Sequence, residues 1–267
     1  MKIKRILSVV IGFPIVALIL IFGNTHVINV LFSIIAIIAM YEYLKSFTKE
    51  NKPVEWVAYL SCLIIAFLGV IPKEYLLQTL GLSLTIIVAL LFIQVIVTNM
   101  KTSISDIMIT LFGICYITLF LLFMPLLYKI QNGNFLIWFI LIAAWGTDTC
   151  AYIVGIKFGK HKFTKISPKK SIEGCIGGTI GAIIIGLIYT IALNIFADLQ
   201  ISYIYIILIT GFLSILAQIG DLSASSIKRT VNIKDFGNLI PGHGGILDRI
   251  DSVIFIAPFA YFLLQLI

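Results

Sequence analysis

The segment from Ser225 to Asp251 is polar in a chain that is otherwise strongly apolar. It gathers basic, acidic and imidazole side chains, namely Lys228, Arg229, Lys234, Asp235, His243, Asp248, Arg249 and Asp251. Gly242, Gly244 and Gly245 form a loop between most of the cations and the last carboxylates, and a glycine backbone can present N–H groups to anionic oxygens. Carboxylates suit Mg²⁺ and clustered cations suit phosphate, so the segment predicts a metal-assisted phosphate site.

Two more carboxylates, Asp148 and Asp221, lie within or at the end of apolar stretches. A carboxylate at bilayer depth costs at least about 3 kcal/mol on insertion scales, so Asp148 should face a water-filled cavity, a cation or a partner. A buried helix–helix hydrogen bond is the alternative. Asp221 alone would be interpreted as a solvated helix end, but Asp248 and Asp251 lie three residues apart and share a helix face. Together these acids suit Mg²⁺, although a helix dipole by itself also favours carboxylates near a helix N-terminus.

A second basic segment, residues 157–170, follows the stretch that bears Asp148. Lys169, Lys170 and Ser171 at its end could hold phosphates. The alternative is that the lysines of this segment lie on anionic lipid headgroups. We interpret Lys169 and Lys170 as phosphate contacts.

The composition places these residues in a membrane protein. Mean hydropathy is +1.11, 60% of the residues are hydrophobic and 12% are charged, whereas about a quarter of the residues of a soluble domain are charged. About nine apolar runs can cross a hydrocarbon core of about 30 Å as helices, because a helix satisfies its own backbone in lipid. The runs are residues 6–22, 27–44, 54–71, 76–98, 107–128, 135–156, 175–196, 203–220 and 252–267. The predicted fold is therefore all-α and polytopic.

The basic residues orient the predicted helices. With nine crossings, all of the 19 Lys and Arg residues except Lys73 and Lys129 fall on one side. Loops rich in Lys and Arg stay cytoplasmic, so the N-terminus and both basic segments are predicted to face the cytosol. The net charge of +7 is thus a topology signal that also suits anionic lipids and nucleotides, and it is not evidence for nucleic-acid binding.

The chain is interpreted as a single integral-membrane domain, residues 1–267. Residues 1–130 carry almost no ionisable group at depth apart from Glu42, and we interpret them as scaffold helices. Residues 131–267 are expected to supply the catalytic helices and cytoplasmic loops.

Glycines recur in the seventh apolar run. Gly174 and Gly178, and likewise Gly177 and Gly181, stand four residues apart, a spacing that permits close helix packing. The four cysteines of the chain form no Cys-x-x-Cys pair, so neither a zinc site nor a disulfide framework is indicated.

The polar segment as a whole resembles the signature of the phosphatidate cytidylyltransferase family, also called the CDP-diacylglycerol synthases. The similar pattern is Ser-x-Ile-Lys-Arg, four residues, Lys-Asp-x-Gly, and then Ile-Pro-x-His-Gly-Gly-Ile-x-Asp-Arg-Ile-Asp, unbroken from Ser225 to Asp251. Two shorter elements extend the resemblance, Asp148-Thr-x-Ala-Tyr-x-x-Gly and Ser-Pro-Lys-Lys-Ser-x-Glu-Gly at 167–174. The N-terminal half is similar in hydropathy only.

This resemblance implies the reaction of CTP with phosphatidate to give CDP-diacylglycerol and pyrophosphate, for phospholipid biosynthesis. It implies Mg²⁺ bound by Asp221 and Asp248, with a monovalent cation such as K⁺ sharing the metal centre. We assign further catalytic roles to Lys228, Arg229 and His243, with His243 contacting a phosphate or the cytidine rather than acting as a base. The expected substrate-binding residues are Asp148, Lys169, Lys170, Ser171, Lys234, Asp235, Gly244, Gly245, Arg249 and Asp251.

The predicted partners are CTP, phosphatidate and membrane lipid. The protein is expected in the cell membrane, with its active site on the cytoplasmic side. A homodimer stays open. The rival class is a secondary transporter or channel, which also uses many helices and buried carboxylates. It would not need a cytoplasmic segment that combines Lys-Arg, His-Gly-Gly and Asp-Arg-x-Asp. A second rival is a CDP-alcohol phosphotransferase, but the Asp-Gly-x-x-Ala-Arg element expected of that family is missing.

Overall fold

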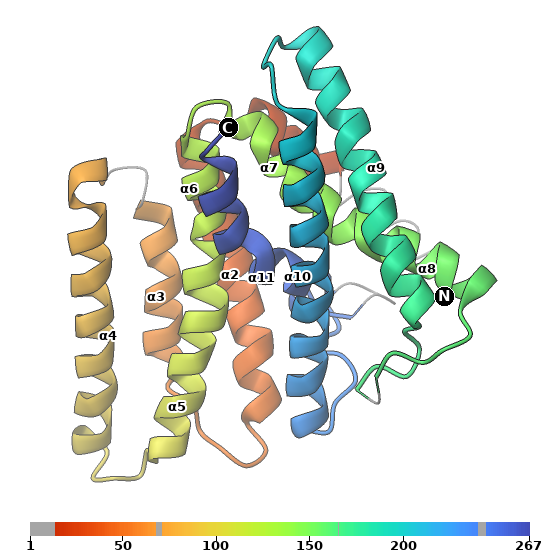
Figure 1. The fold of residues 1–267 in the computed structure, drawn as a ribbon. Helices are drawn as coiled ribbons and strands as arrows, with labels where there is room; N and C mark the ends of the chain where they lie inside the picture. The colour runs from red at the N-terminus through yellow and green to blue at the C-terminus, as the bar shows by residue number, and fades with distance from the viewer. Residues whose placement is uncertain (1–13, 68–70, 165, 240–243) are drawn as a thin grey trace. The chain divides into compact units, whose positions relative to one another are not determined.

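The computed structural model describes residues 14–67, 71–164, 166–239 and 244–267. Regular structure in these residues is helical, and their only extended pairing is an isolated bridge between Lys162 and Ser171. The prediction of an all-α fold is thus confirmed for the part of the chain described (Figure 1). The chain divides into two compact units: unit 1 comprises Met1–Leu126 and Ile233–Arg249, and unit 2 comprises Leu127–Asn232 and Ile250–Ile267.

Unit 1 contains the N-terminal helices. They are α2 (Thr25–Phe47), α3 (Glu55–Phe67), η1 (Lys73–Tyr75), α4 (Leu76–Val97), α5 (Ile104–Gly113) and η2 (Ile114–Leu119), and residues 14–22 are also helical. Side-chain caps explain two of the starts. The Asn24 side chain accepts the N–H of Val27 at 3.0 Å before α2, and Ser103 and Asp106 form a capping box before α5. The next helix, α6 (Phe123–Lys129), crosses the division between the units.

Unit 2 contains the helices that carry most of the predicted site residues. They are α7 (Gly133–Leu141), η3 (Ile142–Gly146), α8 (Thr147–Phe158), α9 (Ile172–Phe196), α10 (Tyr203–Thr230) and, beyond its first three residues, α11 (Leu247–Leu264). The η3 turn is a π-helical turn within the continuous helix Gly133–Phe158, and such turns are frequent at functional sites. Asp148 follows this turn almost directly.

Glycines of α9 let it pack closely against α8. A Cβ atom added to Gly177 or Gly181 would collide with Val154 or Cys150, and one added to Gly178 would lie 2.8 Å from the Thr147 carbonyl oxygen. The close helix packing predicted from the glycine spacing is therefore confirmed.

Neighbouring helices of unit 2 run in opposite directions. On α10 and α11, the Tyr205 hydroxyl donates to the Leu263 carbonyl at 2.9 Å, while Gly220 lies against Ser252 at the other end of the pair. Figure 1 shows α9 running alongside α8 and α10. As a result, the end of α8, the start of α9, the end of α10 and the unit 2 residues that begin α11 lie at one end of the unit.

Six helices among the described residues are long and apolar enough to cross a membrane. They are Thr25–Phe47, Leu76–Val97, Ile104–Lys129, Gly133–Phe158, Ile172–Phe196 and Tyr203–Thr230, and each overlaps a predicted run. Of the other three runs, 6–22 and 54–71 lie partly outside the described residues, and the run 252–267 falls in α11, whose first turns carry three charged residues. The chain is a multi-pass membrane protein by these helices, whereas the count of nine and the cytoplasmic N-terminus stay predictions.

The predicted end of the eighth run is wrong by ten residues. The run 203–220 stops where polarity rises, but α10 continues to Thr230. Lys228 and Arg229 therefore lie on a helix and not in a loop that follows it. Residues 221–230 contain neither Gly nor Pro, the strongest helix breakers, so loss of hydrophobicity ended the apolar run without ending the helix.

Candidate active site

An ion pair between Lys170 and Asp221 lies where the helix ends of unit 2 meet. Lys170 immediately precedes Ser171, the N-cap of α9, and Asp221 lies in the last third of α10. The two side chains are 22% and 26% exposed, although the Lys170 Nζ atom itself is buried. A predicted phosphate contact and a predicted metal ligand are therefore direct neighbours.

A cavity of about 400 Å³ lies beside this pair. Its walls come from α8, the loop before α9, the start of α9 and α10, through Asp148, Ala151, Tyr152, Gly155, Ile156, Lys169, Lys170, Ser171, Gly174, Cys175 and Gln218. Asp148 is exposed, as expected of a carboxylate that faces a water-filled cavity. Small-molecule sites have volumes of roughly 300–1,000 Å³ and a few convergent polar groups, and this cavity meets both criteria.

A buried pair of charges adjoins this region. Asp251 on α11 is 6% exposed and Lys228 on α10 is 8% exposed. Asp251 interacts electrostatically with Lys228 and also with Asp221 and Asp148. Gly220 allows this approach, because a Cβ atom at that position would press into α11. Five predicted site residues of unit 2, including Lys170, therefore belong to one charged cluster.

A chain of side-chain hydrogen bonds supports one wall of the cavity. Gln218 donates to the Thr179 hydroxyl oxygen at 3.0 Å, and Ser214 donates to the same oxygen at 3.1 Å. The Ser214 and Thr147 hydroxyls lie 2.6 Å apart. These bonds tie α10 to α9 and to the start of α8, and they hold Gln218 at the cavity.

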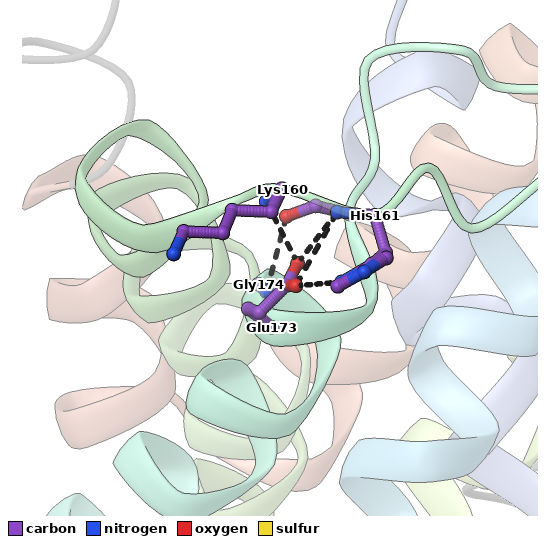
Figure 2. Close-up of polar contacts among 5 residues, drawn as sticks. Lys160, His161, Glu173 and Gly174 are labelled. Carbon is purple, nitrogen blue, oxygen red and sulfur yellow. Dashed lines mark hydrogen bonds and ion pairs between the residues drawn. The ribbon is translucent and has the colours of Figure 1, made fainter.

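The basic loop before α9 is held by Glu173 (Figure 2). The carboxylate of Glu173 accepts the backbone N–H of Lys160 at 3.1 Å and that of His161 at 3.3 Å, and it lies 2.6 Å from His161 Nδ1. The Phe163 N–H donates to the Lys170 carbonyl at 3.0 Å, which closes the loop on itself. Both ends of the loop are thus attached to the start of α9, next to the cavity.

Ser171 has a structural role in addition to the one predicted for it. Its hydroxyl oxygen accepts the N–H of Gly174 at 3.1 Å and so caps α9, and the residue is 7% exposed. A serine directly before the start of a helix is a common N-cap, and the substrate-binding interpretation of Ser171 overlooked this signal.

In unit 1, the segment Ile233–Arg249 folds around two carboxylates. Oδ2 of Asp248 accepts the N–H of Phe236 at 2.8 Å and that of Gly245 at 3.0 Å. Gly244 has a φ of +84°, a left-handed conformation that a side chain would strain. The predicted residues Asp235, Gly244 and Gly245 therefore lie next to the Asp248 carboxylate.

The second carboxylate of this segment comes from Glu42 of α2. It accepts the N–H groups of Ile246 and Leu247, at 3.1 and 2.8 Å. Sequence reasoning assigned Glu42 no role, although an acid in an apolar helix is by default a functional candidate. Its place in an apolar run, in a region with almost no other ionisable group at depth, was the signal that could have identified it.

The remaining predicted residues are more exposed or lie outside the described residues. Arg229, Lys234, Asp235 and Arg249 are exposed, and His243 lies outside the described residues. Among the residues described, no group of three or more His, Cys, Asp or Glu side chains is arranged to hold a metal ion. The pairing of Asp221 with Asp248 around a metal stays a prediction.

Comparison with known proteins relates the whole chain to one group of enzymes. A family model described as "Cytidylyltransferase family" matches residues 3–267. The phosphatidate cytidylyltransferase of Bacillus subtilis (strain 168) is 36% identical over 270 residues, which cover 98% of this chain and 97% of that protein. The enzyme of the same name from Staphylococcus saprophyticus is 36% identical over 85% of this chain and 90% of its own length, and that of Thermotoga maritima is 30% identical over 89% and 87%.

Proposed function

Because the chain belongs to the cytidylyltransferase family, we propose that it transfers the cytidylyl group of CTP to phosphatidate, giving CDP-diacylglycerol and pyrophosphate for phospholipid biosynthesis. The observation that carries the proposal is the charged cavity of unit 2. There, Lys169, Lys170 and Asp148 line the same cavity, and Lys170 is paired with Asp221. A secondary transporter would need buried carboxylates, but it would not need a basic loop held beside helix ends that meet at one end of the unit.

Phosphatidate brings its own nucleophile. Its phosphate is a monoester whose second ionisation falls near neutrality, so an oxygen anion is available without a strong general base. That oxygen attacks the α-phosphorus of CTP, a new P–O bond forms, and the bond to the β-phosphate breaks with its electron pair leaving on pyrophosphate. The task of the protein is therefore to position the two phosphates and to neutralise their charge.

Lysines of unit 2 can supply this charge neutralisation. The Lys170 ammonium has three N–H donors, and Asp221 is the ion-pair partner that the described residues provide for it. Donors thus remain for anionic oxygens that enter the cavity. Lys169 at the cavity and Lys228, Arg229, Lys234 and Arg249 of the polar segment are proposed to offset the remaining phosphate charge.

Mg²⁺ is the metal that these side chains fit. Asp221 and Asp248 offer hard carboxylate oxygens, and Mg²⁺ needs only one or two of them, since waters and substrate phosphates complete its octahedron. We propose that both hold Mg²⁺, which when bound lowers the charge on the phosphates. A monovalent cation such as K⁺ is the proposed second ion. His243 is proposed to contact a phosphate or the cytidine.

The site is proposed to face the cytosol. CTP arrives from water and phosphatidate stays in the leaflet, so a site at helix ends is accessible to both. The abundance of Lys and Arg in the loops on that side supports this orientation.

The decisive assay supplies radiolabelled CTP and phosphatidate to the purified protein in detergent, with and without Mg²⁺. Label should appear in a CDP-lipid only when lipid, nucleotide and Mg²⁺ are all present. An absence of labelled lipid, combined with substrate movement across reconstituted vesicles, would favour the transporter class instead.

A further inference from the structure

Glu42 is a buried acid in a helix that carries no other charged residue before Lys45. It lies on α2, is 3% exposed, and comes from the N-terminal part of the chain, far in sequence from every predicted site residue. A buried carboxylate is costly unless hydrogen bonds compensate it. The partners of Glu42 should therefore reveal its role.

Those partners are backbone groups of the segment Ile233–Arg249. Oε1 accepts the N–H of Ile246 at 3.1 Å, and Oε2 accepts the N–H of Leu247 at 2.8 Å. Leu247 is the first residue of α11, so Glu42 satisfies N–H groups that a helix start leaves without intrahelical partners. One side chain from α2 thus fixes the point at which α11 begins.

Two glycines of the same segment make room for this carboxylate. A Cβ atom added to Gly237 would collide with Glu42 Oε1, and one added to Gly245 would collide with Oε2. Gly237 and Gly245 therefore both lie directly against the Glu42 carboxylate. Substitution of either glycine would displace the acid or the loop.

We infer that Glu42 is a positioning residue for the proposed reaction, which it serves by setting the backbone next to Asp248. Asp248 directly follows Leu247, and it accepts the N–H of Gly245 and Phe236. The Glu42 carboxylate and the Asp248 carboxylate therefore hold one turn between them. The inference rests on the proposed function, because it assigns Asp248 and Arg249 to that active site.

The test compares Glu42→Gln with Glu42→Asp and with Glu50→Gln, a control at an exposed position just beyond α2. Gln keeps the size of the side chain but turns an N–H₂ group toward one of the two backbone donors, whereas Asp keeps both acceptor oxygens. We expect Glu42→Gln to slow turnover (kcat) by about one to two orders of magnitude, because the hydrogen bonds from Ile246 and Leu247 to Glu42, here called the Glu42 clamp, set the geometry of the site. KM for both substrates should stay within about twofold, since this clamp contacts no substrate. Glu42→Asp should recover part of the turnover, and Glu50→Gln should match the wild type.

Hydrogen exchange supplies a readout that does not depend on activity. In Glu42→Gln, peptides that contain Ile246 and Leu247 should exchange at least about tenfold faster, while peptides from α9 keep the wild-type rate. Unchanged exchange at Ile246 and Leu247, or a uniform rise that includes α9, would overturn the inference. A wild-type protein without cytidylyltransferase activity would instead overturn the proposed function, and the exchange data would still report on the clamp.

Discussion

Carboxylates in unit 1 and carboxylates in unit 2 have different partners. In unit 1, Glu42 and Asp248 accept hydrogen bonds from backbone N–H groups, which cannot leave without unfolding the turn. In unit 2, Asp221 pairs with the Lys170 side chain, and Asp251 interacts with Lys228. A side-chain partner can move when a ligand enters. We infer from this difference that Glu42 and Asp248 shape the backbone of the site, whereas the partner of Asp221 is a side chain that a ligand can displace.

The largest expected effect comes from removing the charge of Asp221 or Asp248. We predict that Asp221→Asn and Asp248→Asn each reduce turnover about 10³-fold or more, because each removes a carboxylate proposed to hold the Mg²⁺ that offsets the phosphate charge. Only Asp248→Asn should also loosen the backbone, since its Oδ2 holds Phe236 and Gly245. Radiolabelled CTP assays measure the first effect and hydrogen exchange of the segment Ile233–Arg249 measures the second.

Lys101→Ala is the control for these two variants, since Lys101 is exposed and lies in a loop without a motif. It should retain wild-type turnover. Near-normal activity in purified Asp221→Asn or Asp248→Asn would contradict the metal assignment. Equal loosening in both variants would contradict the contrast between the two units.

Replacing Lys170 by Met should have the next largest effect. Met keeps most of the side-chain volume but removes the ammonium, so we predict that KM for CTP rises by about one order of magnitude or more. The free energy of unfolding should change by no more than about 1 kcal/mol, because Met fills the buried space of the lysine and the partly exposed Asp221 can be solvated without its partner. Initial rates at varied CTP and a thermal melt in detergent check the two parts. A large loss of stability with unchanged KM would make the pair structural.

The features of this arrangement that depend on neighbouring residues could be predicted from the sequence, whereas contacts between residues far apart in the sequence could not. Apolar runs near 20 residues are a local signal, so helices such as α4 and α9 were predicted within a few residues. Lys170 and Asp221 were also named as candidate site residues, since basic and acidic residues stand out in a membrane chain. Their pairing was not, because it joins residues 51 positions apart, and no local pattern encodes such a contact.

Glu42 shows the same limit more strongly. Its partners Ile246 and Leu247 lie 204 and 205 positions away, and they contribute backbone N–H groups that have no residue-specific signature. The end of α10 was misplaced for a different reason. Hydropathy reports burial in lipid, whereas helix formation depends on backbone hydrogen bonding. A fall in hydropathy therefore does not mark the residue at which a helix ends.

A smaller effect is expected where only the shape of the unit 1 turn is changed. A Cβ atom at Gly237 would collide with Glu42, so Gly237→Ala should destabilise the protein by about 1–3 kcal/mol, the range for overpacking. Gly81→Ala is the matched control in α4, because nothing lies within 4 Å of its Cβ position. It should stabilise by about 0.5–1 kcal/mol, through helix propensity. Thermal melts in the same detergent compare the two, and equal shifts would contradict the close packing around Glu42.

The smallest effect is predicted for Glu173, which holds a loop by its backbone but belongs to unit 2. Glu173→Gln leaves one carbonyl oxygen for the N–H groups of Lys160 and His161 and removes the attraction to the His161 ring. Because the loop stays closed through Phe163 and Lys170, we expect KM for CTP to rise only about two- to threefold while turnover is unchanged. Initial-rate kinetics measure both parameters, with Glu50→Gln as the control. If turnover instead fell by about two orders of magnitude, backbone anchoring would be as important in unit 2 as in unit 1. In that case acids that act by holding the backbone of the site would belong to both units.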